Sequence, residues 1–257
     1  MFTFDGIHSD SLNINVNYPN INSIPAVRNY LDFIDGKDGL YDYGLNFKER
    51  YITFNCNFIA NTVTEALAIL DNINKFFNPK DGAKELILDY LPDRYCMARL
   101  YNALDVSRII ANYKNGGEFE LIFLVADPFY YSIAEYNQQY TSDGSYEFDV
   151  GGTYETLPVI TIIADIAEGD DNIQFNFNNL FVLEIQSVME TTYYLEVDCK
   201  NRTIKYIEIA TEDEEVGLIY VYKIAFPPLV VGTNYLEITD NDSCLTSIDI
   251  DYRRRYF

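Results

Sequence analysis

The chain has 257 residues, with 18 Lys and Arg against 40 Asp and Glu, which gives a formal net charge of −22. This length predicts one large or two modest domains. Because 48% of the residues are hydrophobic and only 23% are charged, the composition excludes a disordered acidic polymer. The acid excess also argues against nucleic-acid binding as the main role, since that binding depends on clustered Lys and Arg.

Membrane insertion and export are not expected. No stretch approaches the roughly 20 apolar residues that span a bilayer. The start of the chain, Met1 to Asp5, has neither the basic flank nor the apolar run of a signal peptide.

The four cysteines are far apart in the sequence, so they offer no zinc-ligand spacing. Two disulfides remain arithmetically open, but without an export signal we expect reduced, buried thiols. They are Cys56, Cys96, Cys199 and Cys244.

The first part of the chain contains alternating patterns that are typical of strands. Apolar residues alternate with Asn from Leu12 to Tyr18, which predicts a strand that ends at Pro19. Residues 34–39 contain two Asp/Gly turn signals. Alternation over residues 52–58 predicts a second strand.

One helix is predicted over residues 62–77. Thr62 and Glu65 have the spacing of a capping box, in which each side chain can satisfy a backbone donor at the helix start. Apolar residues then recur three or four positions apart, so this face needs a sheet or another helix to cover it. These residues are Val63, Ala66, Leu67, Leu70, Ile73 and Phe77.

Further strands are predicted at residues 86–88 and 94–101. Asn115-Gly116-Gly117 is a hairpin signal, and the strand that follows it ends at Asp127-Pro128. These patterns predict an N-terminal β domain with one helix over residues 1–132.

Residues 133–257 show no helical stripe. Short alternating segments recur every 8–12 residues, which indicates an antiparallel β-sandwich. The predicted strands are 146–150, 158–163, 173–177, 181–185, 194–199, 203–209, 218–224, 235–239 and 247–252. We therefore expect a mainly β protein with a second domain over residues 133–257.

Charge is divided unevenly between these two parts. Residues 1–132 contain 11 basic and 17 acidic residues, whereas residues 133–257 contain 7 and 23. Arg253, Arg254 and Arg255 stand together near the end of this acidic part. Such surroundings make a poor DNA site, so we predict that the three arginines form a salt-bridged strand end or a subunit contact.

No constellation in the sequence specifies a reaction, a cofactor or a metal site. His8 is the sole histidine, and phosphate-binding glycine loops are missing. Paired carboxylates could hydrolyse glycosides, but 40 acids hide any such pair. The acidic segments 168–172 and 240–242 do not follow a calcium-loop pattern and fit strand-connecting turns. We expect no enzymatic activity.

Tyrosine is abundant, at 23 residues, and could stack on a sugar ring. Tyr193, Tyr194, Tyr220 and Tyr222 are the candidates. At strand spacing, however, aromatic residues more often fill the space between sheets or form a subunit contact.

The order of several short motifs resembles that of the distal tail proteins (Dit, or phage tail component proteins) of long-tailed, siphovirus-type phages. Each motif is weak alone, and the order carries the resemblance along nearly the whole chain. The motifs are residues 2–6, 36–39, the helix at 62–77, 127–131, 157–160, 226–229, 232–234 and 252–256.

This resemblance implies an N-terminal β-sandwich or split-barrel domain that forms a hexameric ring, and a C-terminal galectin-like β-sandwich. One ring, or two stacked rings, would join the tail tube protein to the tail-tip hub and carry or contact receptor-binding proteins. The protein would be made in the bacterial cytoplasm and lie at the distal end of the virion tail. Genome DNA would pass through the channel without specific binding. The alternative is a carbohydrate-binding module that recognises the host surface.

Overall fold

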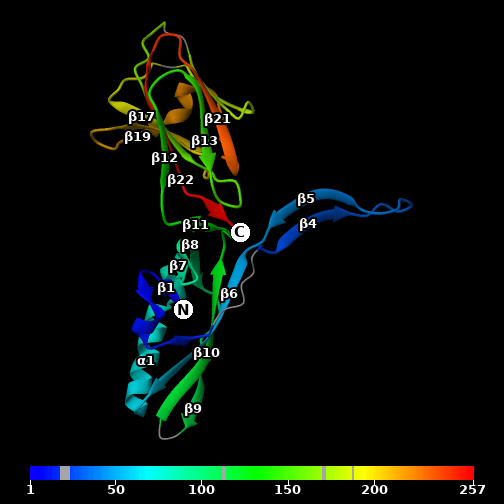
Figure 1. Ribbon diagram of the computed structural model, residues 1–257, viewed down its shortest axis with the longest axis vertical. Helices are drawn as coiled ribbons and strands as arrows, with labels where there is room; N and C mark the ends of the chain where they lie inside the picture. Colours follow the sequence, from blue (N-terminus) through cyan, green and yellow to red (C-terminus); the bar gives the residue numbers. More distant parts are fainter. Residues whose placement is uncertain (18–23, 112–113, 170–171, 187) are drawn as a thin grey trace. The chain divides into compact units, whose positions relative to one another are not determined.

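The computed structural model describes residues 1–17, 24–111, 114–169, 172–186 and 188–257. The chain forms two compact units, which we call the N-terminal unit (Met1–Tyr131 with Phe257) and the C-terminal unit (Ser132–Tyr256). The paired strands described below are antiparallel. The predicted mainly β fold class is confirmed (Figure 1).

The N-terminal unit contains a main sheet in the order β2-β1-β7-β8-β10-β6-β3, with β9 paired to β10, and a separate two-stranded sheet of β4 and β5. Its strands are β1 (Phe2–Phe4), β2 (Ile7–His8), β3 (Asn15–Val16), β4 (Val27–Asp32), β5 (Tyr41–Phe47), β6 (Arg50–Ala60), β7 (Lys84–Leu88), β8 (Leu91–Leu100), β9 (Ser107–Ala111) and β10 (Lys114–Val125). Its helices are the 3-10 helices η1 (Ser9–Leu12) and η2 (Pro79–Asp81) and the helix α1 (Val63–Phe76).

Helix α1 begins at the predicted cap. The Glu65 N–H donates to Thr62 Oγ1 at 3.1 Å, and the Asn61 N–H donates to Glu65 Oε2 at 2.8 Å. Two backbone donors are thereby satisfied at a helix start that would otherwise leave them open.

The helix packs against the main sheet through Ile69 and Ile73, which are buried, and through Phe77 at its end. The predicted apolar stripe was wrong at its N-terminal half, because Val63 and Leu67 remain 49% and 57% exposed. Burial follows the i, i+4 row through residues 69, 73 and 77, and this row leaves the first turns of the helix uncovered.

Aromatic rings form the centre of the N-terminal core. Phe2 lies 4.6 Å from Phe54 between ring centroids, and Phe4 lies 5.1 Å from Phe123. Phe77 of the helix end joins this group at 5.7 Å from Phe4. The first strand, the longest strand pair and the helix are therefore held by one aromatic cluster.

Two predicted local features were wrong in detail. The strand expected from Leu12 starts later, because Leu12 belongs to η1 and Asn13 has a left-handed φ of 56°. Of the predicted strand, the structure forms β3. Tyr18 lies outside the described residues. The glycines Gly116 and Gly117 lie inside β10 and not in a turn. A Cβ on Gly117 would come within 2.5 Å of a Val106 methyl, so this glycine allows close packing.

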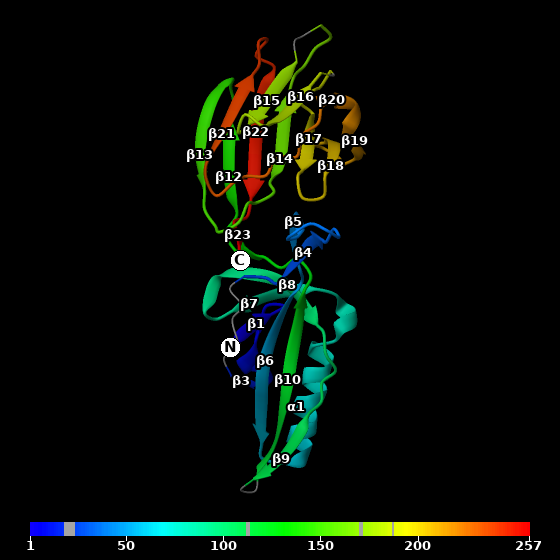
Figure 2. The same cartoon turned by 90° about the vertical axis from the view of Figure 1, so that its right-hand side faces the viewer.

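The C-terminal unit consists of a sheet in the order β12-β22-β14-β17-β18-β19 and a sheet in the order β13-β21-β15-β16-β20 (Figure 2). Its strands are β12 (Tyr136–Tyr140), β13 (Gly144–Val150), β14 (Val159–Ala164), β15 (Ile173–Phe177), β16 (Phe181–Ile185), β17 (Tyr193–Asp198), β18 (Thr203–Glu208), β19 (Glu214–Val216), β20 (Val221–Lys223), β21 (Gly232–Thr239), β22 (Leu245–Tyr252) and β23 (Arg255–Tyr256). The strand β11 (Tyr130–Ser132) precedes them, and the 3-10 helix η3 (Gly217–Tyr220) links β19 to β20.

Both sheets contribute to one hydrophobic core, which includes Ile160 and Ile250 from the first sheet and Phe175 and Leu183 from the second. The strand predicted over residues 218–224 was wrong in its first half, which is η3. η3 starts at Gly217, and a Cβ at this position would lie 2.8 Å from Ile204 Cγ2. The missing side chain therefore lets the chain turn close to β18.

Among the residues that the structure describes, no helix is long and apolar enough to cross a membrane.

Candidate functional site

The hairpin of β4 and β5, which we call the arm, exposes apolar side chains on both strands. Every residue of β4 is exposed, and so is every residue of β5 except Phe47. The exposed large apolar residues are Ile24, Val27, Tyr30, Leu31, Phe33, Ile34, Leu40, Tyr41, Tyr43 and Leu45. A patch of this kind marks an interaction surface, because an isolated two-stranded hairpin is marginal in water.

Contacts within the hairpin stabilise the outer part of the arm. Lys37 Nζ lies 3.4 Å from the centroid of the Tyr41 ring, and the ring of Tyr41 stacks on Tyr43 at 6.4 Å. The arm is anchored at its base, where Phe47 packs edge-on against Phe129 and Phe257 at 5.6 Å and 5.4 Å. Figure 1 shows the arm in blue, leading into β6. The anchor fixes the root of the arm and leaves its apolar surface available to a partner.

The sequence contained a signal for the arm that the prediction of a turn at residues 34–39 did not use. Leu31 and Phe33 precede this turn at strand spacing, and Tyr41, Tyr43 and Leu45 follow it. Alternation on both sides of a turn predicts a hairpin. The alternation alone does not reveal that both faces of this hairpin are exposed.

Part of the face of the main sheet that α1 does not cover is polar. Glu118 pairs with Asn57 across β10 and β6, and Glu120 pairs with Asn55. With Asp105 these residues line a shallow groove of about 460 Å³. Among the described residues that line the groove, none is Lys or Arg. The described lining of the groove therefore carries acidic and no basic side chains.

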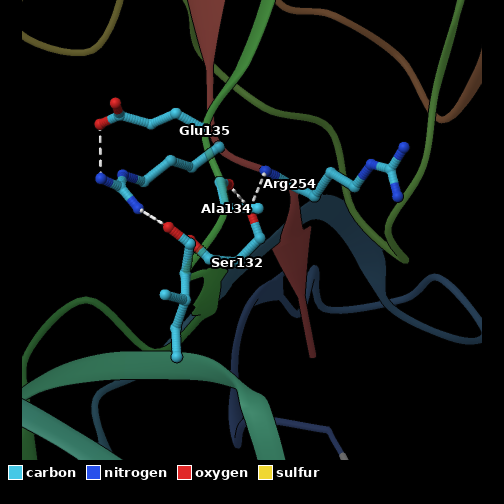
Figure 3. A network of polar contacts seen from close by, with 6 residues as sticks. Ser132, Ala134, Glu135 and Arg254 are labelled. Atoms are coloured by element: carbon cyan, nitrogen blue, oxygen red, sulfur yellow. Dashed lines mark hydrogen bonds and ion pairs between the residues drawn. The ribbon is translucent and has the colours of Figure 1, made fainter.

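The three arginines predicted as assembly contacts make contacts inside the C-terminal unit. The Arg253 guanidinium donates to the carbonyls of Ser132 and Ile133 and pairs with the carboxylate of Glu135. The Arg254 N–H donates to Ser132 Oγ at 3.0 Å, and Figure 3 shows this network from close by. Such contacts agree with the predicted salt-bridged strand end, and a role of the arginines in subunit contacts stays a prediction.

The other two guanidinium groups lie against aromatic rings. Arg254 lies 3.9 Å from the centroid of Tyr136, and Arg255 lies 5.3 Å from Tyr154. Arg255 also donates to the Glu155 carbonyl at 3.1 Å and is 9% exposed. Cation–π contacts and buried donors of this kind depend on the positive charge.

Charge reversal at Arg254 and Arg255 is expected to destabilise the C-terminal unit by about 2 kcal/mol, because a carboxylate would face ring π-density and a backbone carbonyl. Urea unfolding measures this free energy. The matched control reverses Lys200 and Arg202, which lie in an exposed turn. Equal stability of both double variants would show that the arginine contacts contribute nothing.

The residues considered for catalysis or metal binding are engaged in local structure. His8 Nδ1 accepts from the Asp10 N–H at 3.3 Å, and His8 Nε2 lies 3.3 Å from Asp89 Oδ2. Asp240 accepts from the N–H groups of Cys244 and Leu245, at 3.0 Å and 2.8 Å, as strand-connecting turns require. No group of three or more His, Cys, Asp or Glu that could hold a metal occurs in the described part of the chain. Residues 170–171 of the other acidic segment lie outside it.

The four cysteines form no disulfide and are buried, as predicted. Burial raises the pKa of the Cys56, Cys96 and Cys199 thiols to about 12. The reactive thiolate is therefore nearly unpopulated at neutral pH.

A thiol reagent at pH 8 is expected to modify the folded protein very slowly, and to modify four thiols per chain in denaturant. Absorbance of the released chromophore counts the thiols. Rapid modification of one or more thiols in the folded state would contradict the buried placement.

Two of the four tyrosines considered for sugar stacking, Tyr193 and Tyr220, stack on the ring of Tyr206. The ring of Tyr206 lies between Tyr193 at 4.7 Å and Tyr220 at 4.0 Å between centroids. Tyr222 is 64% exposed. The ring faces shared within the stack are closed to a ligand, and sugar binding stays a prediction.

The N-terminal part of the chain matches a family model. Residues 11–125 match the model described as "Phage tail protein RIFT-related domain". The match includes the arm, helix α1, and the β6 and β10 strands that line the polar groove. No curated protein sequence matches the chain.

Solved structures give a match along the whole chain. The Dit protein (gp 19.1) of phage SPP1, described as a paradigm of the hub adsorption apparatus in phages that infect Gram-positive hosts, aligns with a TM-score of 0.77 and 14% identity over 100% of this chain and 98% of that one. Chains of the activated phage P2 baseplate align with a TM-score of 0.48: the calcium form at 9% identity and the strontium form at 8%, each over 94% of this chain and 90% of that one. The resemblance drawn from the motifs is confirmed: residues 11–125 match a phage tail protein RIFT-related domain, and the whole chain has the fold of the SPP1 Dit protein.

Proposed function

We propose that this protein is a structural component of the distal end of a phage tail, where six copies close into a ring that joins the tail tube to the tail-tip hub. The observation that carries this proposal is the arm, an apolar hairpin that the described residues of its own chain leave exposed. On this account the protein contributes a surface for assembly and performs no catalysis.

Self-association into a ring needs two different complementary surfaces on each copy, because head-to-tail contacts close only by rotation. The arm provides one surface. A candidate for the second is the uncovered start of α1, where Val63 and Leu67 border an apolar recess of about 140 Å³ lined also by Phe58 and Val106. The arm protrudes and the recess is concave, so the two surfaces suit a contact between neighbouring copies.

The polar groove suits the lining of a DNA channel. Asp105, Glu118 and Glu120 would repel phosphate groups, and six copies would multiply that charge around the channel. DNA would then pass without binding. The larger acid excess lies in residues 133–257, so we assign most of the net charge to solubility.

The ring would contact the tail tube protein, the tail-tip hub and receptor-binding proteins, and it would occur singly or as two stacked rings. The fold and the phage tail domain support this position in the virion. Assembly would follow synthesis in the cytoplasm of the bacterial host.

Gold-labelled antibody against the C-terminal unit tests the position in intact particles. We expect label at the tip of the tail opposite the head. Label along the tube or at the head, or intact tails that lack the polypeptide, would contradict the proposal.

A further inference from the structure

A second apolar surface occurs in the C-terminal unit, at one edge of its two sheets. β19 is the last strand of one sheet, β20 is the last strand of the other, and η3 links them. We call residues 216–224 the edge segment; Figure 2 shows it around β19 and β20.

The edge segment is unusually apolar for a surface. Its exposed apolar side chains are Val216 (66%), Leu218 (49%), Ile219 (69%), Tyr222 (64%) and Ile224 (50%), and its one exposed charged side chain is that of Lys223. Single exposed apolar residues are normal, but a continuous set on the edge of a sheet exposes the protein to unwanted pairing. Natural edge strands usually carry Lys or Pro, and the one such residue here, Lys223, pairs with Glu184. The apolar character of this edge is therefore a sign of a partner.

The charge around the edge segment restricts that partner. Glu212, Asp213, Glu214 and Glu215 precede it directly, and all four are exposed. The basic residues of the adjoining strands are already paired: Lys205 with Glu214 at 2.8 Å, and Lys223 with Glu184 at 2.5 Å. Glu214 is thus neutralised by Lys205, whereas Glu212, Asp213 and Glu215 add negative charge beside the apolar centre, so the surface complements a partner with apolar and basic side chains.

A second copy of this chain fits the surface poorly. In a two-fold contact the same patch occupies both sides, so the acidic run would face its own copy. Like charges placed opposite each other in an interface cost several kcal/mol. The charge argument thus favours a different polypeptide.

We propose that the edge segment is a docking site for an extended segment of another protein, in which apolar residues alternate with Lys or Arg. The segment would pair as an added strand with β20, the edge strand of its sheet, with its apolar side chains on Tyr222 and on Ile219 of η3 and its basic side chains toward residues 212–215. This inference concerns the C-terminal unit and does not depend on ring formation by the arm.

The test uses the full-length protein and a fluorescent ten-residue peptide that alternates Ile with Lys, followed by anisotropy. We expect saturable binding. The Ile219→Asn, Tyr222→Asn variant should bind about tenfold or more weakly, as expected for central interface residues. The Glu212→Gln, Glu215→Gln variant should bind several-fold more weakly and show a smaller dependence on salt.

Two controls separate docking from general attraction to an acidic protein. Leu180→Asn, at a residue that is 78% exposed in the turn between β15 and β16, should bind within about twofold of the unsubstituted protein. A peptide of the same composition, with its Ile and Lys residues in separate blocks, should bind weakly. Failure of the unsubstituted protein to bind the alternating peptide, or equal binding by the Ile219, Tyr222 variant, would overturn the inference. Loss of ring formation would leave this result unchanged, so the two proposals can fail separately.

Discussion

Substitution of Phe33, Tyr43 and Leu45 by Ser is expected to convert the assembled protein to single chains. These arm side chains are 61%, 67% and 51% exposed, so in an isolated chain they contact mainly water. If each contributes about 2 kcal/mol at a subunit contact, as central interface residues do, their joint loss of about 6 kcal/mol weakens association by roughly 10,000-fold. Sedimentation velocity over a range of concentrations measures the shift.

The same three substitutions should leave folding nearly unchanged, since exposed side chains away from caps and cores change stability by about 0.5 kcal/mol or less. A matched control replaces Leu180, Val188 and Val230 of the C-terminal unit, which are also exposed. If the control variant dissociates as readily as the arm variant, the arm has no particular role. If the arm variant unfolds, the arm is part of the fold and not a contact surface.

Phe54→Ala is expected to give the largest loss of stability, about 3–5 kcal/mol. Phe54 is fully buried in β6, and its ring lies 4.6 Å from Phe2 and 5.9 Å from Phe123. Truncation leaves a cavity where a strand pair, β1 and the helix end meet. Urea unfolding followed by circular dichroism measures the change in free energy.

Tyr51→Ala in the same strand is the control, because Tyr51 lies on the opposite face and is 41% exposed. Its ring contacts Tyr101 at 5.0 Å, so we expect a loss of about 1 kcal/mol or less. Equal losses at residues 51 and 54 would contradict the assignment of the two faces of β6.

Regular patterns in the sequence predicted regular structure well. Alternation over residues 52–58 lies within β6, and the Thr62–Glu65 cap marks the start of α1. The segments 173–177 and 181–185 agree with β15 and β16 in both bounds. In each case, burial of one face enforces the period that the sequence displays.

Positions governed by tertiary packing were predicted less well. Gly117 reads locally as a turn residue, but it serves the close approach of Val106 and Phe58. Gly217 starts a 3-10 helix within a run that alternates like a strand. Local propensity does not contain the neighbours that decide such positions.

The candidate site was the least predictable part. The arginines at 253–255 were noticed because they stand together, whereas the arm was noticed only as a turn. A hairpin that is buried in its own domain and a hairpin that is exposed for binding a partner show the same alternation of apolar and polar residues. The difference is burial, and only the folded chain shows it.

The mass of the purified protein in solution tests the central claim most directly. Multi-angle light scattering should give about six times the 29.7 kDa of one chain, or twelve times for two stacked rings. A mass of one chain that persists at the highest soluble concentration would contradict self-association through the arm.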